Sequence, residues 1–570
     1  MTSWEPAPPA TAGYPGRLPW PAALRHPVLA AALLALVLHG VWALFLASDA
    51  GDLAAQYAWT EFTRRNPDSA YNLSWYGGMH TASYSLLSPY LMSWLGVRTT
   101  AVLAGTLAAA LAAGLLIRAP VARPLPPALW TALALWCNIG SGRVTFAVGV
   151  TFALAAVALL YPRPGPRPVA RLAAVLLLAV LATTASPVAG VFLEVAAAAL
   201  CLTRRRRDAL VLATGPALVM AGTAVVFPFH GVQPFEWYLA VPLVATACYL
   251  ALLVPAPWRT LRIGAAVYAG GIVLTWAVPS PIGSNVERLS LLFAATVVLI
   301  VLLEHTPNPF APGARPAPRL RAFAAGAAFL ALASWQVAKP VGDLLVTAPL
   351  SRTAPVTGPL IDELRRLGAD RSRVEVVPLR SHREASGIAP YVNLARGWNR
   401  QVDVVRNPLF YDGTLTSDSY HAWLRHWGVG YVVLPVDRPD DAAVAEAEIV
   451  AAGHGWLSPV WQDERWRLYQ VADSAPLADP PATVREAGPA AMTVDVPRAG
   501  AVLLRIPWSP WLGVEGDGER TRGCLAEAGE WTVLHASEPG TYRIGGRYGL
   551  TRGSPCLHLP PAAGPAPPAG

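Results

Sequence analysis

Runs of alanine, leucine and valine recur from residue 28 to about residue 338, and nothing comparable follows them. The runs are roughly 16 to 22 residues long, close to the ~20 residues that a helix needs to cross a hydrocarbon core. A helix satisfies every backbone polar group within the segment, as a membrane interior requires. The pattern predicts an α-helical polytopic membrane domain over 28–338 with about eleven spans. The predicted spans are 28–47, 99–117, 128–141, 144–160, 170–184, 188–202, 209–227, 237–255, 263–278, 287–304 and 322–338.

The composition agrees with a membrane protein. Charged residues make up 14% of the 570 residues and hydrophobic residues 54%, whereas a soluble domain has about 25% charged residues. Asn138, Gly140, Ser141 and Gly142 interrupt the third and fourth apolar runs, so this pair forms either two spans or a re-entrant hairpin.

Arginine positions indicate the orientation, because loops rich in Lys and Arg stay in the cytoplasm. With residues 1–27 as a disordered cytoplasmic tail, the inner loops carry most of the loop arginines, including Arg204 to Arg207. The short outer loops carry none apart from Arg143 and Arg288 at helix ends. This predicts a multi-pass plasma-membrane protein with the long loop 48–98 and the chain after 338 outside. The net charge of +8 then reflects topology, and no nucleic-acid partner is expected because the basic residues do not gather on one soluble face.

The outer C-terminal part divides into two predicted modules and a disordered tail over 561–570. Residues 339–480 combine helical spacing at 359–367 and 419–427 with short β-branched runs, which predicts an α/β module. Residues 481–560 show short apolar runs separated by Gly and Pro, which predicts a small β-sandwich. Cys524 and Cys556 are the only cysteines here, and an outer location permits a disulfide between them.

Two carboxylates, Asp49 and Asp52, follow the first predicted span. Carboxylates at this depth are costly unless they face water or a partner. They can act as general base toward an acceptor hydroxyl or hold a divalent cation; the alternative is that they end the helix and mark the membrane interface.

The loop that follows is rich in aromatic residues. Trp75 and Tyr76 precede a Gly-Gly pair and His80, a grouping that suggests a shaped pocket, in which aromatic faces stack on sugars. Trp and Tyr also belong at membrane interfaces in general. The outer segments 393–401 and 407–412 are dense in Arg, Asn, Trp and Tyr, which suits either a carbohydrate-like acceptor or a charged surface helix and turn.

Arginines at the outer end of helices run against the positive-inside bias and need a reason. Asn285 and Arg288 stand at the start of the tenth predicted span, and Arg143 stands at the same level. Bidentate pairing with phosphate is one reason, and an internal ion pair with Glu287, Asp49 or Asp52 is the other. Glu194, inside the sixth predicted span, is either functional or a paired structural acid.

This arrangement of a cytoplasmic N-terminus, an acidic residue after the first span, a long first outer loop and an outer C-terminal domain resembles the GT-C superfamily. The stretches 51–53, 75–78, 84–89 and 428–433 also resemble the 6-pyruvoyl-tetrahydropterin synthase-related membrane proteins and the YfhO-like branch. The chain departs from the GT-C pattern in having Asp49-x-x-Asp52 in place of an Asp-x-Asp pair. This departure leaves open whether the site requires a divalent cation.

The resemblance implies a membrane glycosyltransferase that moves a sugar from a polyprenyl-phosphate donor to a cell-envelope glycan or lipid acceptor. Asp52 is then the expected base, with Asp49 in reserve, and Arg288 or Arg143 stabilises the leaving phosphate. The substrate-binding set is completed by Asn285, His80, Trp75 and Tyr76. The alternatives are a multi-pass transporter or lipid flippase and a non-catalytic envelope-assembly protein.

Overall fold

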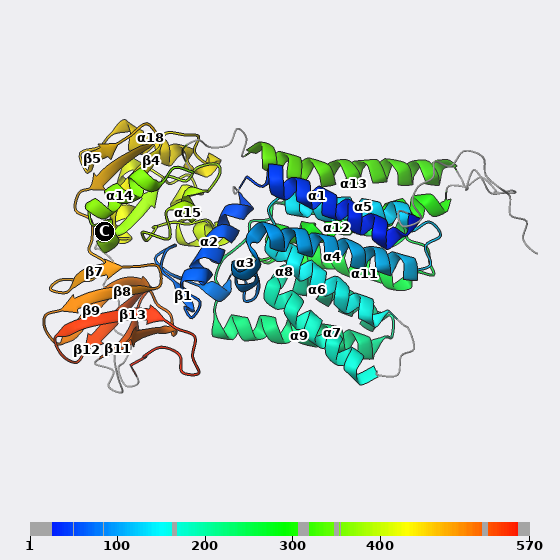
Figure 1. The fold of residues 1–570 in the computed structure, drawn as a ribbon, viewed down its shortest axis with the longest axis horizontal. Helices are drawn as coiled ribbons and strands as arrows, with labels where there is room; N and C mark the ends of the chain where they lie inside the picture. The colour runs from blue at the N-terminus through cyan, green and yellow to red at the C-terminus, as the bar shows by residue number, and fades with distance from the viewer. Residues whose placement is uncertain are drawn as a thin grey trace, which may run out of the picture.

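The computed structural model describes residues 25–48, 51–83, 85–161, 168–305, 319–346, 353, 355–515 and 523–556. A bundle of long helices forms one half of the molecule and two β-containing units form the other, with α2 between the halves (Figure 1). Asp49 and most of both predicted tails lie outside the described residues.

Each predicted apolar run forms a helix, because the backbone N–H and C=O groups of an apolar segment can bond to one another only within a helix. The first, α1, continues as the π-helical turn η2. The helices are α1 Pro27–Val41, η2 Trp42–Leu46, α4 Val97–Arg118, α5 Leu125–Gly140, α6 Val144–Leu160, α7 Pro168–Ala185, α8 Pro187–Leu202, α9 Arg206–Val226, α10 Trp237–Leu253, α11 Arg259–Ala277, η4 Gly283–Val286, α12 Glu287–His305 and α13 Arg319–Val346.

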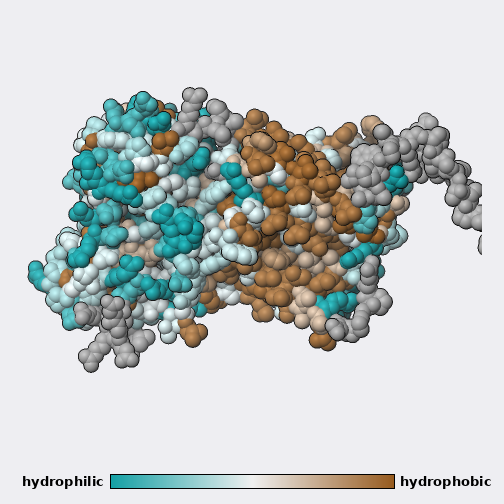
Figure 2. All heavy atoms as spheres, in the orientation of Figure 1, coloured by the Kyte–Doolittle hydropathy of each residue, from teal (hydrophilic) through white to brown (hydrophobic). Residues whose placement is uncertain are grey.

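In the described part of the chain, six helical segments are long and apolar enough to cross a membrane. The predicted number of about eleven spans stays a prediction, because α6, α7, α8 and α10 are apolar but shorter. The surface of the helical half is apolar and that of the other half is polar (Figure 2). Leu44, Phe45, Leu252 and Phe323 are each at least 75% exposed on this apolar surface, which is the property of a face that contacts lipid. The long segments are Pro27–Leu46, Val97–Arg118, Arg206–Val226, Arg259–Ala277, Gly283–Glu304 and Ala322–Leu345.

Two regions differ in detail from the sequence prediction. α13 continues through Pro340 to Val346, so the predicted boundary at residue 338 falls inside a helix. The outer loop 48–98 is itself folded, because its polar and aromatic side chains pack between the two halves. Its elements are α2 Asp52–Arg65, β1 Tyr71–Asn72, β2 Met79–His80, η3 Thr81–Ser83 and α3 Ser88–Leu95.

The two β-containing units are those predicted to lie outside the membrane, and they are called the outer units. The first, the α/β unit of residues 355–471, is built on a four-stranded sheet of order β3-β4-β6-β5, in which β3 and β4 are parallel and the other pairs antiparallel. The two β-branched runs found in the sequence are β3 and β4, and both are buried because helices cover them. The elements are α14 Gly358–Arg366, η5 Ala369–Arg371, β3 Arg373–Val376, α15 Glu384–Gly387, α16 Arg400–Arg406, η6 Pro408–Phe410, α17 Ser417–His426, β4 Val429–Pro435, η7 Asp441–Ala443, α18 Val444–Ala452, β5 Leu457–Gln462 and β6 Trp466–Val471.

The second outer unit contains two antiparallel sheets, of order β10-β13-β8-β7 and β11-β12-β9. Apolar residues alternate along the strands and form one core that includes Leu504, Leu534 and Ile544. A disulfide joins Cys524 on β11 to Cys556, which confirms that these two cysteines pair. The strands are β7 Thr483–Ala487, β8 Ala491–Val496, β9 Gly500–Pro507, β10 Leu512–Glu515, β11 Gly523–Ala528, β12 Trp531–Ala536 and β13 Gly540–Gly546.

Both outer units contact the ends of the long helices directly. The Trp511 indole donates a hydrogen bond to the Val226 carbonyl at the end of α9 (2.9 Å) and stacks on Phe227. Gln401 donates its side-chain amide to the Pro281 carbonyl (2.8 Å), and its own carbonyl accepts from the Val232 N–H. These contacts fix the outer units at one end of the helix bundle.

We predict that α2 and the outer units lie on the same side of the membrane, opposite the arginine-rich turn after α8. Cysteines introduced by D68C and D362C, in a background with Cys201 and Cys248 replaced by serine, should react with an impermeant maleimide on intact cells. The cysteine of R206C should react only after the membrane is opened; labelling of R206C from outside would contradict the topology.

Removal of the disulfide should destabilise the sandwich. The two cysteines are 32 residues apart in the sequence, and closing a loop of this length stabilises a fold by ~3–4 kcal/mol in the chain-entropy model. The double variant C524S/C556S should therefore show faster amide hydrogen exchange in β11 and β12 of the full-length protein, while C201S serves as the matched control. Unchanged exchange in the double variant would show that the disulfide does not stabilise these strands.

Candidate functional site

A cavity of about 250 Å³ lies where the helix bundle meets the α/β unit. Its membrane-side wall comes from η2, the start of α2, the α5–α6 turn and the end of α13. Its outer wall comes from segments that follow β3 and β4 and from the residues before α16. Charged side chains dominate the lining. They are Asp52, Arg143, Asp343, Arg380, His382, Arg400 and Asp440.

Asp52 is placed in this cavity by the way α2 begins. It is the first residue of α2, and its side chain is 45% exposed. A carboxylate at a helix N-terminus is stabilised by the unpaired N–H groups and the helix dipole. The preceding Gly51 has φ +59°, a left-handed conformation that glycine adopts without steric cost. Gly51 therefore sets the direction in which α2 begins, and Asp52 lines the cavity.

The α5–α6 turn forms the floor below Asp52. Gly142 has φ +77°, and a Cβ atom there would lie 3.0 Å from the Leu53 backbone nitrogen and 3.3 Å from the Asp52 Cβ. Gln56 on α2 fixes the turn, because its side chain donates to the Gly142 carbonyl and accepts from the Thr145 N–H. The turn and α2 are thus a single packed unit.

Arg143, the residue before α6, belongs to a chain of charges across this floor. Its Nε lies 3.7 Å from the Asp52 Oδ2, and its Nη2 lies 4.0 Å from the Glu287 Oε1. Lys339 on α13 lies 3.6 Å from the same Glu287 oxygen. The expected internal ion pairs of Arg143 are therefore present, but they are long, and they leave room for stronger pairing with a ligand.

Several polar atoms of the cavity wall are buried without a hydrogen-bond partner in the described part of the chain. Buried polar groups in proteins are nearly always bonded, so each exception needs an explanation. Four such atoms around one cavity, three on the membrane-side wall and one on the outer wall, indicate a place where a polar ligand or water completes the bonding. They are the Trp42 Nε1, the Ser141 Oγ, the Arg143 Nε and the Arg380 Nε.

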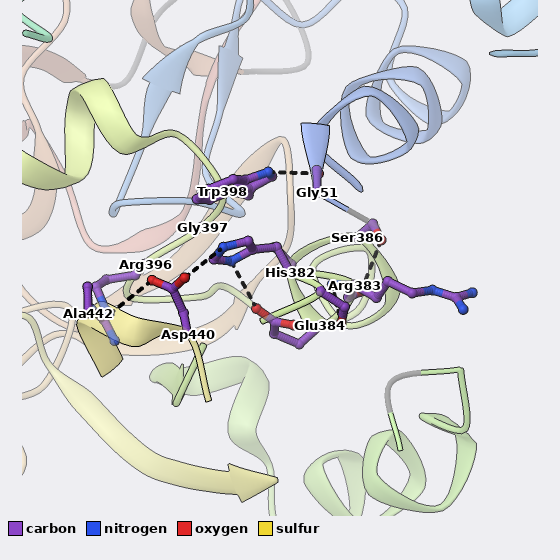
Figure 3. Close-up of polar contacts among 12 residues, drawn as sticks. Gly51, His382, Arg383, Glu384, Ser386, Arg396, Gly397, Trp398, Asp440 and Ala442 are labelled. Carbon is purple, nitrogen blue, oxygen red and sulfur yellow. Dashed lines mark hydrogen bonds and ion pairs between the residues drawn. The ribbon is translucent and has the colours of Figure 1, made fainter. Parts of the chain in front are cut away.

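His382 organises the outer wall. Its two ring nitrogens each lie 3.7 Å from a carboxylate, Glu384 on one side and Asp440 on the other, and its ring stacks on Trp398 at a centroid distance of 3.4 Å (Figure 3). Its φ is +54°, a conformation that costs on the order of 1–3 kcal/mol in a residue other than glycine. Arg400 completes the group with a bond to Asp440 (3.2 Å).

The charges of this group support one another. Burial alone lowers the pKa of His382, but Asp440 and Glu384 beside it raise that pKa above its ordinary value. Burial alone would raise the pKa of Asp440, but His382 and Arg400 lower it to about 2. The pair is therefore an imidazolium next to a carboxylate in the mildly acidic range.

The outer wall also holds the start of α2. The Trp398 indole donates to the Gly51 carbonyl (2.8 Å), as Figure 3 shows, and the Gly51 N–H donates to the Ser381 carbonyl (2.9 Å). Both backbone groups of the residue before Asp52 are thus bonded to the α/β unit.

Trp75, Tyr76 and His80 do not line the cavity. Trp75 is 1% exposed and donates its indole N–H to the Ala385 carbonyl. The buried Tyr76 hydroxyl donates to the Gly397 carbonyl (2.9 Å) and accepts from the Asn399 N–H. Burial lowers the pKa of His80 to about 4, with help from Arg406 and His230. These side chains hold the loop and the outer units together.

Arg288 and Asn285 do not line the cavity. Arg288 lines a narrow cavity of about 10 Å³ that shares Ser141 and Arg143 with the larger one, and its guanidinium lies over the Phe146 ring. Asn285 is half-buried in η4. Arg143 is therefore the arginine that meets Asp52.

The polar segments 393–401 and 407–412 mainly form a buried network. Arg396 is 5% exposed and pairs with Glu375 (2.8 Å) and Glu446. Asn407 is fully buried and donates to Asp403. Much of the polar density that suggested acceptor binding is thus internal, although Trp398 and Arg400 reach the cavity.

Among the described residues, no three His, Cys, Asp or Glu side chains are grouped so as to hold a metal ion. Asp49, the other carboxylate of the sequence motif, lies outside the described residues. The divalent cation left open by the sequence stays a prediction.

Sequence reasoning found Trp398 and Arg400 within the polar segment 393–401 but missed the rest of the outer wall of the cavity. Arg380, His382 and Asp440 stand in no motif, and they meet Asp52 only because the α/β unit packs on α2. Asp343 was missed because α13 is longer than the apolar run that predicted it.

The stability of this junction should depend on pH through His382. Since its pKa is raised on folding, its contribution is complete below the unfolded pKa of about 6.5 and is lost as the pH rises through the folded value. The thermal midpoint of wild type should therefore fall more steeply than that of H382Q between pH 6 and 9. H426Q, which alters a half-exposed histidine on α17, should follow wild type; equal slopes in wild type and H382Q would refute the charge assignment.

Comparison with known proteins gives one family match and weak structural likenesses. Residues 479–560 match a family described as "Domain of unknown function (DUF8823)". No curated protein matches the chain in sequence.

Two solved structures illustrate the likenesses. The arabinofuranosyltransferase AftD from Mycobacteria is 14% identical with a TM-score of 0.44 over 93% of this chain, which spans 40% of its length. The oligosaccharyltransferase of Archaeoglobus fulgidus is 12% identical with a TM-score of 0.42, over 79% of this chain and 74% of its own. Likeness at this level shows neither a shared reaction nor a shared substrate.

Proposed function

We propose that this protein is a GT-C-like membrane glycosyltransferase that moves a sugar from a polyprenyl-phosphate donor to a cell-envelope acceptor at the outer membrane face. The observation that carries the proposal is the half-exposed Asp52 carboxylate 3.7 Å from Arg143 in one cavity. That cavity lies at the boundary between the apolar helices and the polar outer units, where a lipid-linked substrate presents its head group.

Asp52 supplies the base in this proposal. It accepts the proton of the acceptor hydroxyl while the hydroxyl oxygen forms a bond to the anomeric carbon of the sugar. The bond between that carbon and the phosphate oxygen breaks, and its electron pair leaves with the lipid phosphate. The carboxylate faces the cavity from the N-terminus of a helix, where unpaired N–H groups stabilise negative charge, and it is therefore placed to take this proton.

Arg143 stabilises the departing phosphate. Its pairs with Asp52 and Glu287 are 3.7 and 4.0 Å long, so the guanidinium can bond more closely to phosphate oxygens, for which its fork is suited. Donors positioned at developing charge usually make the largest contribution to such a reaction. Arg143 is preferred to Arg288 because it shares the cavity with Asp52.

The direct test is release of polyprenyl phosphate from labelled polyprenyl-phosphate sugars by the purified full-length protein. D52N keeps the shape of the side chain and removes its charge, so release should fall roughly 10²–10⁴-fold while donor binding persists. D362N, at an 80% exposed aspartate on α14, is the matched control. Wild-type protein that binds such donors and never releases the lipid phosphate would point to transport and refute the proposal.

A further inference from the structure

Arg380 is held rigidly on the outer wall of the cavity. It follows β3, and its backbone N–H donates to the Arg438 carbonyl (3.2 Å). The neighbouring Leu379 forms a bridge with Pro439, and the Ser381 carbonyl accepts from Gly51. The backbone is thus fixed on both sides, and the side chain lines the cavity.

The Arg380 guanidinium has no ion pair or hydrogen bond to any described residue, and its Nε is buried. Four other arginines of the α/β unit have side-chain partners. Arg373 bonds to the Trp427 and Arg505 carbonyls, Arg396 to Glu375 and Glu446, Arg400 to Asp440, and Arg406 to the Tyr76 and Gly78 carbonyls.

The carboxylates of the cavity do not neutralise Arg380. Asp440 pairs with His382 and Arg400, and Asp52 pairs with Arg143. No ion pair joins Arg380 to Asp343 in the described residues. Arg380 is half-buried, but its Nε is buried without a hydrogen-bond partner. Buried polar groups are nearly always bonded, so this fixed guanidinium in a cavity wall indicates an anion that comes from outside the chain.

We propose that Arg380 forms a second anion site in this cavity, which binds a phosphate group carried either by the lipid-linked donor, as a second phosphate, or by the acceptor. The identity of these carriers rests on the proposed function. Arg143 and Arg380 belong to opposite walls, so the two arginines serve two positions. A guanidinium binds phosphate through two parallel hydrogen bonds.

The test measures binding without turnover. Inorganic phosphate, pyrophosphate, polyprenyl phosphate and polyprenyl diphosphate are titrated into the full-length protein in detergent by calorimetry. R380Q should weaken binding of the relevant probe roughly ten- to hundred-fold, and R380K should recover part of it because the charge returns without the planar fork. R365Q, at a 58% exposed arginine on α14, is the matched control for loss of one positive charge.

The probes distinguish the two carriers. If the donor carries the second phosphate, R380Q weakens binding of polyprenyl diphosphate and leaves that of polyprenyl phosphate unchanged. If the acceptor carries it, R380Q weakens binding of inorganic phosphate in the presence of saturating polyprenyl phosphate. Equal affinities of wild type and a folded R380Q for all four probes would overturn the inference, as would an equal loss in R365Q.

The inference and the proposed function fail separately. If anion binding depends on Arg380 but the protein releases no lipid phosphate, the second anion site is supported and the proposed transferase activity is refuted. If the protein releases lipid phosphate but its anion binding does not depend on Arg380, the transferase activity is supported and the second anion site is refuted.

Discussion

Both backbone groups of Gly51 are bonded to the α/β unit, and the geometry of the site depends on these two hydrogen bonds. Ser381 and Trp398 provide them, although Trp398 is 347 residues away in the chain. They fix the point at which the chain begins α2, and therefore the position of Asp52. The carboxylate of the membrane half and the cations of the outer half consequently face one cavity. A helix bundle without its outer units would lack half of this site.

Charge is distributed differently in the two parts of the α/β unit. Around Arg396, three carboxylates and the Tyr420 hydroxyl enclose one guanidinium, and every member has a partner. Such a network specifies a unique packing and becomes costly when one member is lost. At the cavity, by contrast, His382 is fully paired while Arg380 is not. The first arrangement supports the unit, and the second suits the binding of a charged ligand.

The sequence predicted the features that depend on local pattern. Apolar run length gave the membrane helices, β-branched runs gave β3 and β4, and an acid directly after the first span gave Asp52. It did not predict features that depend on packing between distant segments. Trp75 and Arg396 look like ligand-binding residues in the sequence but are buried by tertiary contacts, whereas Arg380 and His382 carry no local signal. Periodicity in the sequence indicates which face of an element is apolar, but it does not indicate which loops come into contact in the folded protein.

A ligand-bound structure tests the central claim, that one cavity shared by the two halves binds a lipid-linked sugar phosphate. The measurement is cryo-electron microscopy of the full-length protein with a non-hydrolysable polyprenyl-phosphate sugar. The account predicts density for the phosphate within hydrogen-bonding distance of Arg143 and for the sugar beside Asp52. A ligand bound elsewhere, with this cavity empty at saturating concentration, would contradict it.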